Sequence, residues 1–192
     1  DLTNNSFIDD YNGQLGAPPS PINDIRDYLK NGQLFTSSTI GGNAIGYVAN
    51  TQAHLASYQG HVFPLNMYGQ IDYSQVLFKF TYGGDADLNG IINSVDYFQI
   101  DRGFLDHYTG WFNGDFNYDG TVNSQDYFII DSNFIDQSGM LAAPEVRAHA
   151  AEFGPSYLDQ FTPSQLAAIG VPEPGSLLLL AAGAMGLLAR PP

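Results

Sequence analysis

Aspartate and asparagine side chains recur at alternate positions in two short stretches of this sequence, and they are the residues best suited to chemistry. Residues 84–96 read Gly-Asp-Ala-Asp-Leu-Asn-Gly-Ile-Ile-Asn-Ser-Val-Asp, and residues 114–126 read Gly-Asp-Phe-Asn-Tyr-Asp-Gly-Thr-Val-Asn-Ser-Gln-Asp. Carboxylate, amide and carbonyl oxygens are the ligands that the hard cation Ca²⁺ takes, and a central glycine permits the sharp turn that gathers them. The duplicated pattern therefore predicts two calcium loops.

Each stretch has a suitable residue at every ligand position of an EF-hand type of calcium loop, which are positions 1, 3, 5, 7, 9 and 12. In the first loop the predicted ligands are Asp85, Asp87, Asn89, the Ile91 carbonyl, Asn93 and Asp96. In the second loop they are Asp115, Asn117, Asp119, the Thr121 carbonyl, Asn123 and Asp126. Position 9 binds directly or through water. We expect two Ca²⁺ ions, one in each loop.

Runs of Asp, Asn and Gly are also the ordinary composition of turns, so a single such loop is weak support for a metal site. Two loops that agree at all six ligand positions, each followed by apolar residues at helical spacing, favour calcium over a plain turn. Magnesium also binds carboxylates, but a cage built wholly from protein oxygens favours calcium. Because carboxylates brought together repel one another, metal binding is expected to stabilise the fold.

A helix is expected after each loop, because apolar residues follow at helical spacing. In the first repeat these are Tyr97, Phe98, Ile100, Phe104 and Leu105, and in the second they are Tyr127, Phe128, Ile130, Phe134 and Ile135. We expect the two stripes to pack the two helices on one another. Trp111 lies between the repeats, and we expect it to pack their connection.

Composition excludes several classes of function. The 192 residues carry a formal net charge of −14, which would repel nucleic acid and anionic lipid. The absence of cysteine excludes disulfides, thiolate metal sites and thiol nucleophiles. The four histidines are scattered, and no phosphate-binding loop, nucleophile elbow or zinc-protease motif is present. We therefore expect no catalytic role.

The predicted fold class is α+β. The region 1–82 is expected to be a β-rich module with an Asn12-Gly13 turn, one short helix that begins at Pro21, and a clear strand at 76–82. The region 83–137 is expected to form a small α module of two loop-helix repeats, and 138–170 a helical linker with a capping box at Thr162 and Gln165. The region 171–192 is expected to be a hydrophobic tail helix. The chain begins at Asp1 without a secretory signal, so its amino end is either processed or cut from a longer parent, and we expect the second.

The two repeats resemble a type I dockerin module, because position 12 carries Asp instead of the usual Glu and no helix is expected before the first loop. The resemblance implies a cohesin-like protein partner that binds helix residues at and after loop positions 10 and 11. Those positions match the Ser-Thr and Lys-Arg pairs often found in the family only in part. The implied partner-binding residues are Ser94, Val95, Asp101, Arg102, Ser124, Gln125, Asp131 and Ser132.

The carboxyl end resembles the PEP-CTERM sorting signal, with Pro172-Glu173-Pro174, an uncharged run from 177 to 189, and then Arg190. The run is shorter than the roughly 17 to 25 residues that cross a bilayer unaided. The resemblance implies a transient membrane contact, processing by an exosortase, and export through a Gram-negative envelope. Residues 1–82 are similar to the segment that joins autotransporter-like β-solenoid proteins to a dockerin and a tail of this kind, and Leu2-Thr3-Asn4-Asn5 followed by Ile8 resembles a final solenoid rung.

These features together predict a non-catalytic, calcium-binding protein that is secreted to the bacterial cell surface and acts in protein attachment or extracellular matrix assembly. The expected partner is a cohesin-like or other extracellular protein, and self-assembly and exopolysaccharide binding are the other contacts open to it. One alternative is the carboxyl-terminal region of a polysaccharide-degrading enzyme with its catalytic domain upstream. Another alternative is a structural subunit of an extracellular filament.

Overall fold

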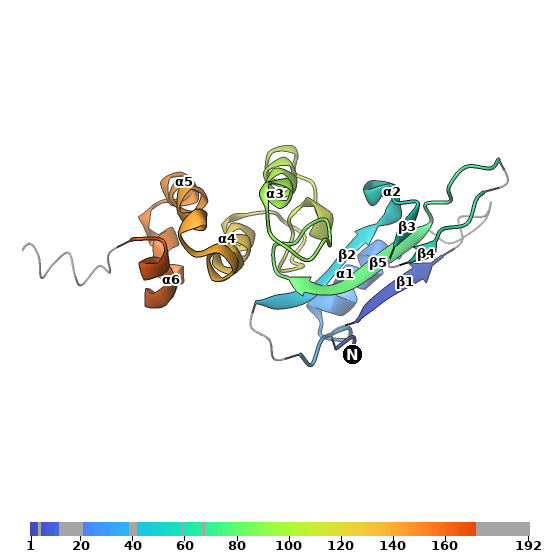
Figure 1. Ribbon diagram of the computed structural model, residues 1–192, viewed down its shortest axis with the longest axis horizontal. Helices are drawn as coiled ribbons and strands as arrows, with labels where there is room; N and C mark the ends of the chain where they lie inside the picture. The colour runs from blue at the N-terminus through green and yellow to red at the C-terminus, as the bar shows by residue number, and fades with distance from the viewer. Residues whose placement is uncertain (4, 12–20, 39–41, 59, 67, 172–192) are drawn as a thin grey trace, which may run out of the picture. The chain divides into compact units, whose positions relative to one another are not determined.

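The computed structural model describes residues 1–171 except for 4, 12–20, 39–41, 59 and 67, and it combines helices with small antiparallel sheets (Figure 1). The mixed α and β composition predicted from the sequence is thereby confirmed. Contacts divide the chain into two compact units, Asp1–Asn133 and Phe134–Pro192, and each is described by itself. The predicted Asn12-Gly13 turn and the predicted tail helix lie outside the described residues.

The first unit contains a three-stranded antiparallel sheet in the order β1-β5-β2. Strand β1 spans Ser6–Asp10, β2 spans Asn43–Ala49 and β5 spans Gln75–Tyr82. In the central strand β5, Val76, Leu77 and Phe78 are all buried, so both of its faces are covered. The strand predicted at 76–82 is confirmed. It is apolar on both faces over these three residues, a pattern typical of a strand at the centre of a layered structure.

The connection between β2 and β5 holds a short helix α2, Asn50–Ala53, and a two-stranded ribbon of β3, Ser57–Tyr58, and β4, His61–Val62. All strand pairs in the described part of the chain are antiparallel. Rungs of a β-solenoid are parallel strands, so the rung predicted near the amino end finds no parallel partner among the described residues.

The helix predicted after Pro21 is present as α1, Ile22–Lys30, and it buries Ile25 and Leu29 as its apolar stripe requires. Pro21 occupies the N-cap and not the first helical position. Asn31 closes the helix, and its backbone N–H bonds to carbonyls of the last turn. The helix lies near β2 within the first unit.

A helix follows each Asp-rich loop, as predicted. The first is α3, Ser94–Asp106, and the second is α4, Ser124–Ser138, with a 3₁₀ turn η1, Trp111–Asn113, between them. Trp111 is fully buried between the repeats. The prediction that every apolar residue of the stripe after each loop packs the two helices together is only partly correct. Phe98 and Leu105 are 58% and 74% exposed, because they lie on the face of α3 turned away from the buried Ile100.

The second unit contains the end of α4, the 3₁₀ turns η2, Gly139–Ala142, and η3, Pro155–Gln160, and the helices α5, Ala143–Phe153, and α6, Pro163–Ala168. The predicted capping box of α6 is confirmed: the Thr162 hydroxyl accepts from the Gln165 N–H, and the Gln165 side chain accepts from the Thr162 N–H. Aromatic contacts link Phe153, Tyr157 and Phe161. Among the described residues, no helix combines the length and the apolar character needed to span a bilayer.

Candidate metal centre

The two Asp-rich loops have the same backbone hydrogen-bond pattern, although their sequences differ at several positions. The carboxylate at position 12 accepts backbone N–H groups from positions 2, 3 and 9 in both loops. For Asp96 the donors are Ala86 at 2.8 Å, Asp87 at 3.4 Å and Asn93 at 2.8 Å. For Asp126 they are Phe116 at 2.8 Å, Asn117 at 3.2 Å and Asn123 at 3.0 Å. The position-12 side chain therefore organises each loop from its helix end.

The backbone turns of the two loops also agree. Position 4 has left-handed backbone in both, with φ of 62° at Leu88 and 63° at Tyr118. The position-6 glycines follow with φ of 95° at Gly90 and 93° at Gly120, a conformation that glycine adopts without steric cost. A residue with φ above zero is uncommon outside glycine, so its occurrence at the same loop position twice marks a shared, tightly constrained conformation.

The first loop gathers three carboxylates. Oxygen atoms of Asp85, Asp87 and Asp96 lie within 4.8 Å of one another. At an effective dielectric of about 20, two unit charges at this distance repel by about 3.5 kcal/mol. Asn89 lies against this group, and its side-chain amide donates to the Asp87 carboxylate at 3.0 Å. Four of the six predicted ligands of this loop are thus brought together.

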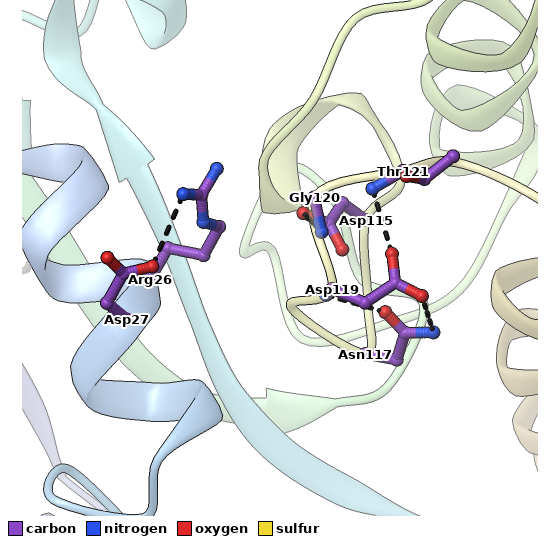
Figure 2. A network of polar contacts seen from close by, with 7 residues as sticks. All are labelled: Arg26, Asp27, Asp115, Asn117, Asp119, Gly120 and Thr121. Atoms are coloured by element: carbon purple, nitrogen blue, oxygen red, sulfur yellow. Dashed lines mark hydrogen bonds and ion pairs between the residues drawn. The ribbon is translucent and has the colours of Figure 1, made fainter.

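In the second loop, the Asp115 carboxylate lies beside Gly120 at the centre of the loop (Figure 2). Asp115 is fully buried. Its carboxylate Oδ2 accepts a hydrogen bond from the Gly120 N–H at 3.2 Å, and its Oδ1 is buried without a hydrogen-bond partner. A buried oxygen without a partner costs about 1–3 kcal/mol, so such atoms are rare without a functional reason. Asn117 and Asp119 complete this side of the loop, with the Asn117 amide donating to Asp119 at 3.1 Å.

Positions 7 and 9 are arranged alike in both loops. The Asn93 and Asn123 side chains each accept a helix N–H, from Val95 and Gln125, at 2.8 Å. Because these oxygens already cap the helices, ligation through water suits position 9 better than direct contact. At position 7, the Ile91 N–H donates to Asn89 at 2.9 Å, and the Thr121 N–H donates to Asp119 at 2.8 Å.

Burial makes the carboxylate charges costly in the absence of a cation. It raises the pKa of Asp96 to about 7 and that of Asp126 to about 6, although backbone N–H donors oppose the rise in both. Burial also raises the pKa of Asp85 and Asp115, against hydrogen bonds from Thr81 and Gly90 in the first case and from Gly120 in the second. The ion pairs within the described residues are Arg26–Asp27 and Arg102–Asp106, so none of these four carboxylates is neutralised by one.

The sheet of the first unit supports both loops, a relationship that the sequence patterns did not indicate. The Thr81 hydroxyl of β5 donates to the Asp85 carboxylate, and the Trp111 indole N–H donates to the Asp85 carbonyl at 2.7 Å. From the second loop, the Tyr118 hydroxyl donates to the Ile45 carbonyl of β2 at 2.9 Å. Two of these contacts, Trp111 to Asp85 and Tyr118 to Ile45, join residues 26 and 73 positions apart, and no local pattern in the sequence indicated them.

Gly46 of β2 permits this close approach. A Cβ atom at this position would lie 2.7 Å from the Trp111 Nε1, closer than real Cβ contacts come, and it would also meet the Leu88 side chain. The Trp111 ring stacks on Tyr118 with 5.7 Å between centroids and meets Phe116 edge-on at 5.0 Å. The loops are therefore packed on the sheet through an aromatic cluster.

The predicted partner-binding residues fall into two environments. On α3, Ser94, Val95, Asp101 and Arg102 are exposed. On α4, Gln125 is exposed and Ser124 and Ser132 are half-buried, whereas Asp131 is fully buried and accepts a hydrogen bond from Tyr97. The interface between the repeats occupies the Asp131 carboxylate, so that residue does not belong to an accessible binding face.

The residue types at the ligand positions of both loops fit a calcium ion, and in the first loop three of their carboxylates lie together. Both loops present carboxylate and amide oxygens from the same positions around a glycine turn, and the second holds a buried carboxylate oxygen that lacks any donor. A hard divalent cation supplies the missing charge and takes oxygen ligands of this kind. A cation bound by these ligands would stabilise the fold, because its charge would relieve the repulsion among the carboxylates.

No curated protein and no solved structure is detectably similar to this chain. One family model matches it, over a short stretch at the carboxyl end that overlaps the predicted sorting signal. Residues 170–190 match the PEP-CTERM protein-sorting motif, so this is an exported protein directed to the cell surface.

Proposed function

We propose that residues 84–136 form a calcium-binding, dockerin-like module, and that the exported protein uses it for non-catalytic attachment to another extracellular protein or for matrix assembly. The observation that carries the calcium assignment is the pair of loops with one backbone pattern, one of which buries the unpartnered Asp115 Oδ1. The acidic cluster of Asp85, Asp87 and Asp96 supports the same assignment in the first loop.

Among the described residues, no ion pair neutralises a loop carboxylate. Calcium stabilises the module because its charge offsets the repulsion among these carboxylates. Binding to the folded state alone stabilises a protein by about 2.7 kcal/mol when the free ion is at 100 times its dissociation constant. The chain has no disulfide to constrain it, so this contribution is a large fraction of a typical folding free energy. Export fits such a design, because extracellular calcium is abundant enough to occupy weak sites.

Attachment is assigned to the exposed face of α3. Val95 and Leu105 are 46% and 74% exposed, and Phe98 between them is 58% exposed, so an apolar stripe with Arg102 beside it faces outward. Large exposed apolar side chains gathered on one helix face are a common feature of protein interfaces. The partner is an extracellular protein in a Gram-negative envelope, and the sorting tail contacts the membrane transiently before processing.

The test is calorimetric titration of the whole chain with CaCl₂ after treatment with chelator, together with thermal unfolding in calcium and in chelator. We expect two binding events and a midpoint that rises by several degrees in calcium. Asp85→Asn with Asp115→Asn should remove both effects. MgCl₂ at the same concentration serves as the control and should give much weaker binding. Absence of binding heat and of any midpoint shift at millimolar calcium would refute the calcium assignment.

The attachment role has a separate test. Envelope protein should be retained by the immobilised chain in calcium and released by chelator, and Val95→Asp with Leu105→Asp should abolish retention while leaving calcium binding intact. Substitution of the exposed Tyr68, which lies outside both loops, should change nothing. Equal retention by the α3 variant and the unaltered chain would contradict the proposed surface.

A further inference from the structure

Each calcium loop has one basic side chain at the same loop position, supplied by a different element of the first unit. The Lys79 ammonium of β5 donates to the Leu88 carbonyl at 2.7 Å and lies 3.3 Å from where a Cβ on Gly90 would be. The Arg26 guanidinium of α1 lies 3.6 Å from the equivalent point on Gly120, and it extends from its helix toward the second loop (Figure 2). Both glycines stand at position 6.

Neither cation occupies a ligand position. The ion pairs within the described residues join Arg26 to Asp27 at 3.3 Å and Arg102 to Asp106 at 3.9 Å, so neither Lys79 nor Arg26 pairs directly with a loop carboxylate. Both nevertheless act on the loops through space, because each side chain reaches the position-6 glycine of its loop, next to the carboxylates gathered there. A metal ion and the basic side chain can therefore be present together.

The placement is notable because basic residues are scarce. The chain has six Lys and Arg against 20 Asp and Glu, and two of the six stand at matching points of the duplicated loops. The elements that supply them, a strand and a helix, are not part of the repeat. Lys30, on the same helix as Arg26, is exposed and provides a natural comparison.

We propose that Lys79 and Arg26 set the calcium affinity of the first and second loops, respectively. Each cation offsets carboxylate repulsion in the metal-free loop and repels the divalent ion in the loaded loop, so it stabilises the metal-free fold and weakens binding. The amino-terminal sheet and helix thus regulate the metal sites. This inference rests on the calcium-binding function proposed above.

The two loops should differ in the size of the effect. A single positive charge about 8 Å from a divalent ion weakens its binding constant by about sixfold at the dielectric of bulk water, and by more at the lower effective dielectric near a protein surface, so a change of about tenfold is a conservative expectation. Lys79 is half-buried and forms no ion pair with a carboxylate among the described residues, so it should have the full effect. The Arg26 charge is partly neutralised by Asp27, so it should have a smaller one.

The experiment compares the whole chain with Lys79→Gln, Arg26→Gln and the control Lys30→Gln by calcium titration. The backbone N–H resonances of Gly90 and Gly120 report the two loops separately, since each donates to the position-1 carboxylate of its own loop. We expect Lys79→Gln to tighten binding at the first loop about tenfold, Arg26→Gln to tighten it less at the second, and Lys30→Gln to change neither. Lys79→Arg, which keeps the charge, should bind as the unaltered chain does.

Thermal unfolding in chelator gives a second readout, and here Lys79→Gln should lower the midpoint more than it does in calcium. A purely structural role for Lys79 predicts the opposite, with calcium binding weakened and both midpoints lowered alike, and that outcome would overturn the proposal. If Lys79→Gln does not fold, Lys79→Met keeps the aliphatic stem and tests the same charge. No calcium binding by the unaltered chain would refute the proposed function, whereas normal binding with unchanged variants would refute only this inference.

Discussion

The Tyr97 hydroxyl of α3 donates a 2.8 Å hydrogen bond to the Asp131 carboxylate of α4, and the Tyr127 hydroxyl of α4 returns a 2.7 Å hydrogen bond to Asp101 of α3. The pairs occupy matching positions of the two repeats, so the duplication in sequence is an approximate twofold relationship in space. The two bonds differ in environment, because Asp131 is fully buried and Asp101 is exposed. The duplicated helices are thus held by equivalent bonds of unequal strength.

Replacement of these tyrosines by phenylalanine should destabilise the protein unequally. Tyr97→Phe removes a donor from a buried carboxylate and should cost about 1–3 kcal/mol of unfolding free energy, whereas Tyr127→Phe leaves a carboxylate that water can reach and should cost about 0.5–1 kcal/mol. Chemical denaturation measures both, with Tyr108→Phe at an exposed tyrosine as control. If Tyr127→Phe lost more unfolding free energy than Tyr97→Phe, the burial of the acceptor carboxylate would not determine the strength of these two hydrogen bonds.

Exchanging the position-3 residues of the two loops should change calcium affinity and metal-free stability in opposite directions. Asp87→Asn gives the first loop the residue of the second and should weaken calcium binding there at least tenfold, while raising the stability of the metal-free protein because one repelling carboxylate is removed. Asn117→Asp should strengthen binding at the second loop and lower metal-free stability. Calorimetry and thermal unfolding in chelator check both, and parallel shifts of affinity and metal-free stability in either variant would contradict this explanation.

Acidity should control both stability and binding through Asp96 and Asp126. Their pKa values in the metal-free protein are about 7 and about 6, above an unfolded value of about 3.9. Between about pH 4 and 7 the folded state therefore holds more protons than the unfolded state, so metal-free stability falls as pH rises through this range. Calcium binds the ionised form, so binding should release protons near pH 6 and almost none at pH 8.

Calorimetry at pH 6 in two buffers with different ionisation enthalpies measures this proton release. The apparent heats should differ between the buffers at pH 6 and agree at pH 8. Asp106, an exposed carboxylate paired with Arg102, offers the control Asp106→Asn, which should leave the buffer dependence unchanged. Equal heats in both buffers at pH 6 would show that the loop carboxylates are already ionised.

Gly46→Ala should disturb the packing of the loops on the sheet and lower the free energy of unfolding. The added Cβ would lie 2.7 Å from the Trp111 Nε1, so the indole or β2 must move, and overpacking of this kind costs about 1–3 kcal/mol. Thr51→Ala, at an exposed position of α2, is the control and should change stability by less than about 0.5 kcal/mol. Because the same indole holds the Asp85 carbonyl, we also expect weaker calcium binding at the first loop. Unaltered affinity with reduced stability would mean that the loop does not need the sheet.

Local patterns predicted several of the helices and the central strand well. The helix after each loop, the central strand β5, the helix α1 and the capping box of α6 follow from apolar periodicity and capping residues, which act within a few positions of one another. The agreement of the two loops at every ligand position likewise predicted their common conformation, because it rests on glycine and Asx chemistry inside each loop.

Long-range relationships escaped prediction, because nothing local encodes them. No pattern near Gly46 indicates that Trp111 will lie against it, and no pattern near Lys79 or Arg26 indicates which loop each will face. The exposure of Phe98 and Leu105 was missed for a related reason. Apolar residues at helical spacing occur both on buried helix faces and on exposed faces that bind partners, so the period of the sequence does not determine whether such a face is buried.

The glycine that opens each loop packs on the helix of the other repeat. A Cβ on Gly84 would lie 2.9 Å from the Cα of Ile130, and a Cβ on Gly114 would lie 2.7 Å from the Cα of Ile100. Each loop thus packs against the helix that follows the other loop. Ordering one loop therefore lowers the conformational entropy that is lost when the other loop becomes ordered. The two ions should consequently bind with positive cooperativity, visible as a Hill coefficient above 1, and the chain would switch between loaded and empty states over a narrow range of calcium.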